Sequence, residues 1–275
     1  MIEPASMESE TAFDRLLLIL CGSEKSGKSR TAATARKPIL FLDFDKRRQS
    51  LAGLKDVYAL TFTDEQWPKM PTGYNDLLTI LTKLEQGATI KDLVPGSKEH
   101  PTTETRPPHT LVFDSLASLG KSASQYALYT NKDIRRTLTV GGQQIFMPGG
   151  WDAWNAETES VFSAVMRAMA MRSLDIILIF HESAQETADS TSDKPKFTGK
   201  LDLYPARYRV FNKYFSEVWR VSRETGGTIP KIQVVPDFRF TASSNLDFSK
   251  LKPEQLNPPM GPNISDLIKI ATGKV

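Results

Sequence analysis

Four short apolar runs lie along the chain, and three of them end at or just before an acid or a histidine. They read "RLLLIL" from residue 15, "ILFLDFD" over residues 39–45, "TLVFD" up to residue 114 and "LDIILIF" up to residue 180. Short runs that are apolar at nearly every position are typical of strands buried on both faces of a parallel sheet. The pattern therefore predicts a central sheet that contains at least these four strands.

Segments with helical spacing of apolar residues separate these runs. Leucines recur at positions 77, 78, 81 and 84 within residues 74–87, and valines 161 and 165 share a face within residues 151–173. We expect a shorter helix from about Gly27 to Arg36, ended by Pro38, and a closing helix in "GPNISDLIKIATG". Strands that alternate with helices predict an α/β fold with a mostly parallel sheet and right-handed crossovers.

The remaining segments are loops or an antiparallel pair. "FSEVWRVSRE" and "KIQVVPDFRF" flank "TGGTIP" and predict a C-terminal β-hairpin. Residues 87–109 hold four prolines and predict an inserted loop, and residues 183–203 predict a long polar loop. Residues 120–150 are mixed and glycine-rich, so we expect them to be partly loop. Trp151 and Trp154 share a helix face, which favours core packing over a base-stacking platform.

We expect a flexible N-terminus over residues 1–11, one α/β domain over residues 12–245 and a tail with a short helix over residues 246–275. Composition adds little to this picture, because 40% hydrophobic residues, 24% charged residues and a net charge of +3 are ordinary for a globular protein. The single cysteine, Cys21, excludes an intramolecular disulfide and is expected in the core. The absence of a signal-peptide pattern and of any run near the ~20 apolar residues of a membrane helix predicts a cytoplasmic protein.

A phosphate-binding motif follows the first apolar run. The letters "GSEKSGKS" satisfy G-x-x-x-x-G-K-[ST], and an apolar strand before and a helix after supply the context that this motif requires. We expect Lys28 to contact the β- and γ-phosphates of a nucleotide and Ser29 to ligate Mg²⁺. The residues expected around the phosphates are Gly22, Ser23, Glu24, Lys25, Ser26, Gly27, Lys28, Ser29 and Arg30.

Acids at the ends of the other strands predict the rest of a hydrolytic site. Asp114 is expected to hold Mg²⁺. Asp45 is a candidate to position or deprotonate the attacking water, with a surface ion pair to the basic residues after it as the alternative, and Glu182 is its rival. Asp43 is expected to be structural. His181 is expected to sense the γ-phosphate, because ligands bind at the carboxyl ends of such strands.

These segments resemble the core of RecA-type ATPases. "GSEKSGKS", "FLDFDKR", "LVFDSLASL" and "IILIFHES" occur in the family's order, the metal-binding acid is followed by serine, and the second strand ends in acid-x-acid, although the family usually has glutamate where Asp45 stands. The resemblance covers roughly residues 12–245. It is closest to a phage-type branch of AAA or nucleotide-binding proteins that includes single-strand annealing recombinases. It implies a RecA-like fold, ATP and Mg²⁺ as cofactors, and ATP hydrolysis.

The resemblance also implies partners. In RecA-like recombinases two loops line a DNA channel within a ring or filament, and the matching segments here are about 120–150 and 183–203. Self-association and single-stranded DNA are therefore expected, with a single-strand binding protein as a further candidate partner. The basic residues expected at DNA are Lys121, Arg135, Arg136, Lys194, Lys196 and Lys200. The family also supplies a basic residue across the subunit interface, and Arg239 and Lys213 are both candidates for it.

The sequence thus predicts an ATP-hydrolysing protein that acts on single-stranded DNA in phage-type annealing or strand pairing, in the host cytoplasm if it is phage-encoded. The first alternative is an ATP-gated switch that grips a protein, such as a helicase loader. A second alternative is a small-molecule kinase, which a basic lid over the phosphates would support. The polar, acid-containing segment 183–203 does not resemble such a lid.

Overall fold

The structure is a computed structural model that describes most of the chain. The described residues are 15–64, 70–94, 96, 102–182, 185–187, 196–198, 206–224, 227–235 and 242–272.

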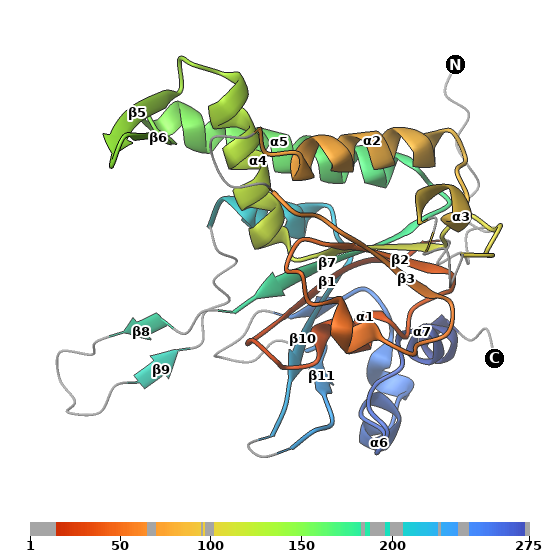
Figure 1. The fold of residues 1–275 in the computed structure, drawn as a ribbon. Coiled ribbons are helices and arrows are strands. Elements are labelled where there is room, and N and C mark those ends of the chain that lie inside the picture. The colour runs from red at the N-terminus through yellow and green to blue at the C-terminus, as the bar shows by residue number, and fades with distance from the viewer. Residues whose placement is uncertain are drawn as a thin grey trace, which may run out of the picture.

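A mostly parallel sheet forms the centre of the molecule (Figure 1). Its order is β11-β10-β1-β7-β4-β2-β3, with β12 paired to β10. The strands are β1 Leu17–Gly22, β2 Ile39–Asp43, β3 Val57–Thr61, β4 Thr110–Asp114, β7 Asp175–His181, β10 Glu217–Ser222, β11 Lys231–Gln233 and β12 Ser243–Ser244. All pairs are parallel except those of β11 and β12 with β10. This arrangement confirms the predicted RecA-like α/β core and the C-terminal antiparallel hairpin.

Helices cover both faces of the sheet. Helices α2, α4 and α5 lie over one face, and α1, α6 and α7 lie on the opposite side (Figure 1). The α-helices are α1 Lys28–Ala32, α2 Gly73–Glu85, α3 Ile90–Leu93, α4 Leu116–Thr130, α5 Trp151–Ala170, α6 Pro253–Leu256 and α7 Ile264–Thr272. The 3₁₀ helices are η1 Arg48–Leu51, η2 Ala206–Lys213 and η3 Phe248–Lys250. In the part of the chain that the structure describes, no helix is long and apolar enough to cross a membrane.

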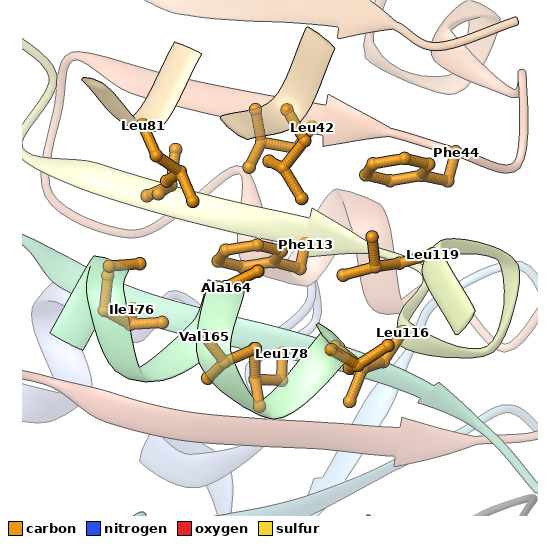
Figure 2. Close-up of a cluster of buried hydrophobic side chains, with 14 of the residues drawn as sticks. Leu42, Phe44, Leu81, Phe113, Leu116, Leu119, Ala164, Val165, Ile176 and Leu178 are labelled. Carbon is orange, nitrogen blue, oxygen red and sulfur yellow. The ribbon is translucent and has the colours of Figure 1, made fainter. Parts of the chain in front are cut away.

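Successive side chains along each strand point to opposite faces of the sheet, and they form two hydrophobic cores, one on each face. Leu178 of β7 packs in the core under α2, α4 and α5, whereas its neighbour Ile177 packs in the core on the α1 and α7 side. Figure 2 shows Phe113 of β4 among side chains of the first core, with Val165 of α5 nearby. Each large side chain buried in this way contributes roughly 1.5–3 kcal/mol to stability. Both cores together fix the strand ends, where the site lies.

Two small hairpins extend from the body. Strands β5 Arg135–Val140 and β6 Gln143–Pro148 form one, and β8 Gln185–Thr187 and β9 Lys196–Thr198 form the other. Both project beyond the helical layers in Figure 1. Residues 120–150 are therefore the later part of α4 and a regular hairpin, where the sequence predicted a partly irregular segment.

Several other elements differ from the sequence-based expectation. Strand β3 and helix α6 were not predicted, and α3 lies inside the segment 87–109 that was expected to be only a loop. Helix α1 ends at Ala32, before the expected Arg36, because the N–H of Thr34 donates to the carbonyl of Thr31 and tightens the chain into turns.

The tryptophan prediction was wrong. Trp151 is 82% exposed and Trp154 is 44% exposed, so neither is a core residue. Their position in the first turn of α5, directly after the β5–β6 hairpin, places them at the end of the helix that is furthest from the sheet contacts of Val161 and Val165. Cys21, in contrast, is buried as predicted.

Candidate active site

The carboxyl ends of four parallel strands meet at one edge of the sheet and open into a cavity. Strands β1, β7, β4 and β2 are neighbours that run in the same direction, so the residues that follow them lie together. The cavity has a volume of about 260 Å³. The residues that line it are Lys25, Ser26, Gly27, Lys28, Ser29, Arg30, Asp45, Arg47, Ser50, Asp114, His181 and Arg223.

The predicted phosphate loop connects β1 to α1, and its two glycines stand where no side chain fits. A Cβ on Gly22 would lie 2.1 Å from the carbonyl oxygen of Val221, and the residue has a φ of +154°. A Cβ on Gly27, with φ +100°, would lie 2.9 Å from Cβ of Pro230. The glycines are therefore required by the close approach of β10 and the segment before β11, as well as by the backbone turn.

Lys28 is folded into this loop. Its side chain is buried, and Nζ donates hydrogen bonds to the carbonyls of Gly22 at 2.8 Å and Ser23 at 2.7 Å. Burial lowers the pKa of Lys28, while the nearby carboxylates of Asp114 and Glu182 oppose that change. The ammonium group is therefore positioned at the cavity by the loop backbone itself.

Ser29 and Asp114 face each other across the cavity floor. The hydroxyl of Ser29 donates to Oδ2 of Asp114 at 2.6 Å, and only 7% of Asp114 is exposed. Burial raises the pKa of Asp114 to about 6, and the negative charges of Asp45 and Asp43 add to this effect. Asp114 has no cationic hydrogen-bond partner among the described residues. A buried carboxylate of this kind beside a hydroxyl oxygen fits a hard divalent cation. Ser29 and Asp114 would hold Mg²⁺, which would neutralise charge on phosphate oxygens.

Asp45 is held at the cavity by three side-chain partners. It accepts hydrogen bonds from Ser115 Oγ at 2.9 Å and from Ser118 Oγ, and His181 Nε2 lies 2.9 Å from its Oδ2. Burial opposes ionisation, but these hydrogen bonds outweigh it and hold the pKa of Asp45 well below its usual range. Asp45 is therefore an ionised acceptor at neutral pH, held at the cavity by β7 and by the first turn of α4.

The two other acids at these strand ends have structural partners. Asp43 accepts the backbone N–H groups of Arg47 at 3.1 Å and Arg48 at 3.2 Å, which agrees with the structural role predicted for it. Glu182 forms a two-pronged ion pair with Arg220, at 2.7 Å to Nε and 3.2 Å to Nη2. Glu182 does not line the cavity, whereas Asp45 does. The geometry favours Asp45 over Glu182 as the carboxylate that acts on water.

His181 lies where the γ-phosphate sensor was predicted. It ends β7, lines the cavity and contacts Asp45. Its Nδ1 is buried and has no hydrogen-bond partner among the described residues. The imidazole of His181 therefore contacts both the cavity and the carboxylate of Asp45.

A second, larger cavity adjoins the first. Its volume is about 560 Å³, and Arg30 and Arg223 line both cavities. The remaining lining residues are Thr31, Ala33, Thr34, Lys37, Leu54, Thr228, Ile229, Pro230, Met260, Gly261, Pro262 and Asn263. They come from α1 and the residues after it, from Leu54 before β3, from the β10–β11 hairpin and from the segment before α7, so four separate parts of the sequence meet here. Sequence reasoning did not find this cavity or Arg223, because no local motif marks residues that meet only in the fold.

The residues expected to contact DNA differ in their exposure and in whether the structure describes them. Lys121 on α4 and Arg136 on β5 are exposed. Arg135 is only half-exposed, because its guanidinium donates to the carbonyls of Leu128 and Tyr129 and lies over the ring of Phe146. Lys196 belongs to β9, and Lys194 and Lys200 lie outside the described residues.

Of the residues expected to act across a subunit interface, Lys213 is exposed at the end of η2 and does not line the cavity, and Arg239 lies outside the described residues.

A glycine-rich loop between a buried strand and a helix, with its lysine, a serine paired to a strand-terminal aspartate and a mostly parallel sheet, defines a P-loop ATPase domain. A family model described as an AAA domain matches residues 15–237, and the chain belongs to that family. No curated protein matches the chain.

Similar solved structures include the flagellar accessory protein FlaH from Methanocaldococcus jannaschii. It is 9% identical, covers 88% of this chain and 97% of its own, and has a TM-score of 0.30. That likeness is too weak to support an inference about function.

Proposed function

We propose that this protein binds and hydrolyses Mg²⁺-ATP and couples the nucleotide state to single-stranded DNA in phage-type annealing or strand pairing. One observation supports the proposed ATP hydrolysis: five side chains meet at one edge of the sheet. Lys28, Asp45 and His181 line the cavity, and Ser29 and Asp114 pair at its floor. Their gathering at one cavity supports the roles proposed for them.

Each of these residues has its own role in the proposed reaction. Lys28 and the loop backbone hold the β- and γ-phosphates, and bound Mg²⁺ supplies charge neutralisation. Asp45 Oδ2 accepts a proton from the attacking water once His181 turns its Nε2 toward the terminal phosphate. Ser115 and Ser118 keep the carboxylate in place by their hydrogen bonds. General-base assistance of this kind is worth ~10²–10⁴ in rate.

The larger cavity favours a nucleotide over inorganic polyphosphate as the ligand. It shares Arg30 and Arg223 with the phosphate cavity, and Ile229, Pro230 and Met260 offer it apolar surface. A base and ribose need such a surface beside the phosphates, because most of a small ligand's area is buried on apolar groups. We place the nucleoside there.

The DNA part rests on the end of the molecule that carries the β5–β6 hairpin. Lys132 and Arg136 are exposed there, and Trp151 presents an 82% exposed aromatic side chain at the start of α5. Lys121 is also exposed, but it lies nearer the active-site end of α4. Basic residues contact phosphates, and an aromatic ring stacks on bases without regard to sequence. Helix α4 runs between this end and the active site, since its N-cap Ser115 and its first-turn Ser118 bind Asp45.

One observation favours the alternative, an ATP-gated switch that grips a protein. Leu138, Ile145 and Met147 lie on the same face of the hairpin and are 48%, 42% and 45% exposed. Aliphatic side chains contribute to protein interfaces more than to nucleic-acid interfaces. The two proposals differ in the partner and agree on the ATPase.

Fluorescence anisotropy with a labelled single-stranded oligonucleotide distinguishes them. We expect binding at low salt that changes when ATP is added, and loss of the ATP effect in Lys28→Ala. No binding at low salt, with or without ATP, would support the protein-gripping switch. Replacing Lys194, Lys196 and Lys200 together with alanine tests the second candidate loop, because DNA binding should weaken while nucleotide affinity stays the same.

A further inference from the structure

Arg223 stands directly over the phosphate loop. It follows the last residue of β10, the strand that pairs with β1 up to the Cys21–Arg220 position, so the chain leaves the sheet at the level of the loop. Its Nη2 lies 3.2 Å from the place that a Cβ on Gly27 would occupy. The guanidinium therefore packs against the second glycine of the motif and helps to explain why that position has no side chain.

The charge of Arg223 is not neutralised within the described part of the chain. Nearby Arg220 is paired with Glu182, and Arg47 lies 3.8 Å from Glu24, but no hydrogen bond or ion pair to a described residue engages Arg223. Its sequence neighbour Glu224 pairs with Lys231 across the β10–β11 hairpin. The described lining of the larger cavity holds Arg30 and Lys37 beside Arg223 and no acid, while the acids Asp45 and Asp114 line the phosphate cavity. An anionic ligand is the partner that this arrangement suits.

Arg223 also marks the boundary between the two cavities, because it lines both. A ligand with phosphates on the loop and a nucleoside in the larger cavity must pass this boundary. With the terminal phosphates beside Lys28 and His181, which line only the first cavity, the phosphate at the boundary would be the one bonded to the ribose.

We propose that Arg223 binds the α-phosphate of the nucleotide and is supplied by the same chain that carries the phosphate loop. The proposal rests on the proposed ATPase function and adds a residue to it. It is separate from any basic residue that a neighbouring subunit provides at the γ-phosphate. It also gives the β10–β11 hairpin a direct contact with the nucleotide, because Pro230 packs against Gly27 beside Arg223.

Isothermal titration calorimetry with Mg²⁺-ATP, Mg²⁺-ADP and AMP tests the proposal on the full chain. The variants are Arg223→Ala and Arg223→Lys. The matched control is Arg172→Ala, which removes an exposed arginine from the turn before β7, at the opposite edge of the sheet. We expect Arg223→Ala to weaken ATP and ADP by the same factor, tenfold or more, and Arg223→Lys to lose less. AMP, where its binding is measurable, should weaken as well, and Arg172→Ala should stay within twofold of the unaltered protein.

Three outcomes would overturn the proposal. If Arg223→Ala binds ATP and ADP within twofold while Lys28→Ala loses binding, Arg223 has no phosphate role and the ATPase proposal stands. If only ATP is weakened, Arg223 contacts the γ-phosphate and the α-phosphate assignment is wrong. If the unaltered protein binds no nucleotide, the proposed function fails together with this inference. Thermal melting without nucleotide should be equal for all variants, since a fall confined to Arg223→Ala would indicate a structural role.

Discussion

Asp114 carries its negative charge at a position that disfavours it. Its folded pKa of about 6 lies above its ordinary value of 3.8, because burial and two neighbouring acids penalise the ionised form. The folded chain therefore binds this proton more tightly than the unfolded chain. Stability falls as pH rises through the range from about 4 to about 6 and stays reduced above it. The ionised Asp114 therefore lowers the stability of the fold at neutral pH.

Asp114→Asn should remove that cost. At pH 7 with a chelator and without nucleotide, the variant should be more stable by up to roughly 3 kcal/mol, since about 2 pKa units at ~1.36 kcal/mol each are at stake. The advantage should vanish near pH 4, where the natural side chain is protonated. Urea unfolding at both pH values measures this. A less stable variant at pH 7 under these conditions would contradict the account of Asp114.

Asp45 and Glu182 can be separated by a pair of amide variants. Asp45→Asn should keep ATP affinity within about threefold and lower the hydrolysis rate by ~10²–10⁴, because it removes a general base. Glu182→Gln should leave hydrolysis nearly intact but lower the melting temperature, since it breaks the partly buried pair with Arg220. Phosphate-release assays and melting curves report the two effects. The reverse pattern would make Glu182 the catalytic carboxylate.

At the scale of elements, α4 is the part that links site and surface. Its N-cap Ser115 and first-turn Ser118 bind Asp45, and its last turn leads into the β5–β6 hairpin. Within the described part of the chain, the strands of this hairpin pair only with each other, and the face that carries Leu138, Ile145 and Met147 is partly exposed. A two-stranded hairpin of this kind is marginal by itself.

The turn of this hairpin offers a specific way to disrupt it. Gly141 and Gly142 both have positive φ, at 58° and 79°, and a Cβ at either would meet open space. Gly142→Val therefore introduces backbone strain of ~1–2 kcal/mol without a clash. We expect faster hydrogen exchange in residues 135–148 and weaker DNA binding, with unchanged ATP affinity. Unaltered DNA binding in a variant whose hairpin exchanges rapidly would remove the hairpin from the DNA site.

The sequence predicted some elements and missed others for identifiable reasons. Strands such as β4 are apolar throughout and lie in the sheet interior, so the run alone identifies them. Strand β3 is at the sheet edge and only half-buried, and its pattern is too weak to distinguish it from a loop. The β5–β6 hairpin did carry a signal, because a Gly-Gly turn between two polar-apolar runs is typical of hairpins.

The site residues also divide into those that the sequence predicted and those that it missed. Lys28, Ser29, Asp45, Asp114 and His181 were predicted, because a motif or a strand end marks each of them in the sequence. Ser118 and Arg223 were missed, because their roles depend on tertiary contacts with Asp45 and Gly27 that no spacing along the chain reveals.

At the scale of the whole molecule, the parallel strands place the candidate nucleotide cavity at one edge of the sheet, and α4 runs from that edge toward the β5–β6 hairpin. The DNA proposal therefore requires a mainly electrostatic contact there. The logarithm of affinity should fall with the logarithm of salt concentration, with a slope near −0.7 per phosphate contacted. The double variant Lys132→Ala, Arg136→Ala should make this slope shallower by ~1.4. Salt titrations by anisotropy measure it, and an unchanged slope would place the DNA elsewhere.

The central claim is that the strand-end cavity is a Mg²⁺-ATP site built around Lys28. Calorimetric titration of Mg²⁺-ATP into the full chain and into Lys28→Ala tests it most directly, with Lys55→Ala as an exposed-lysine control. We predict saturable one-site binding by the unaltered protein and by the control, and no detectable binding by Lys28→Ala at equal thermal stability. Equal affinity in Lys28→Ala and in the unaltered protein would contradict the assignment of the phosphate loop.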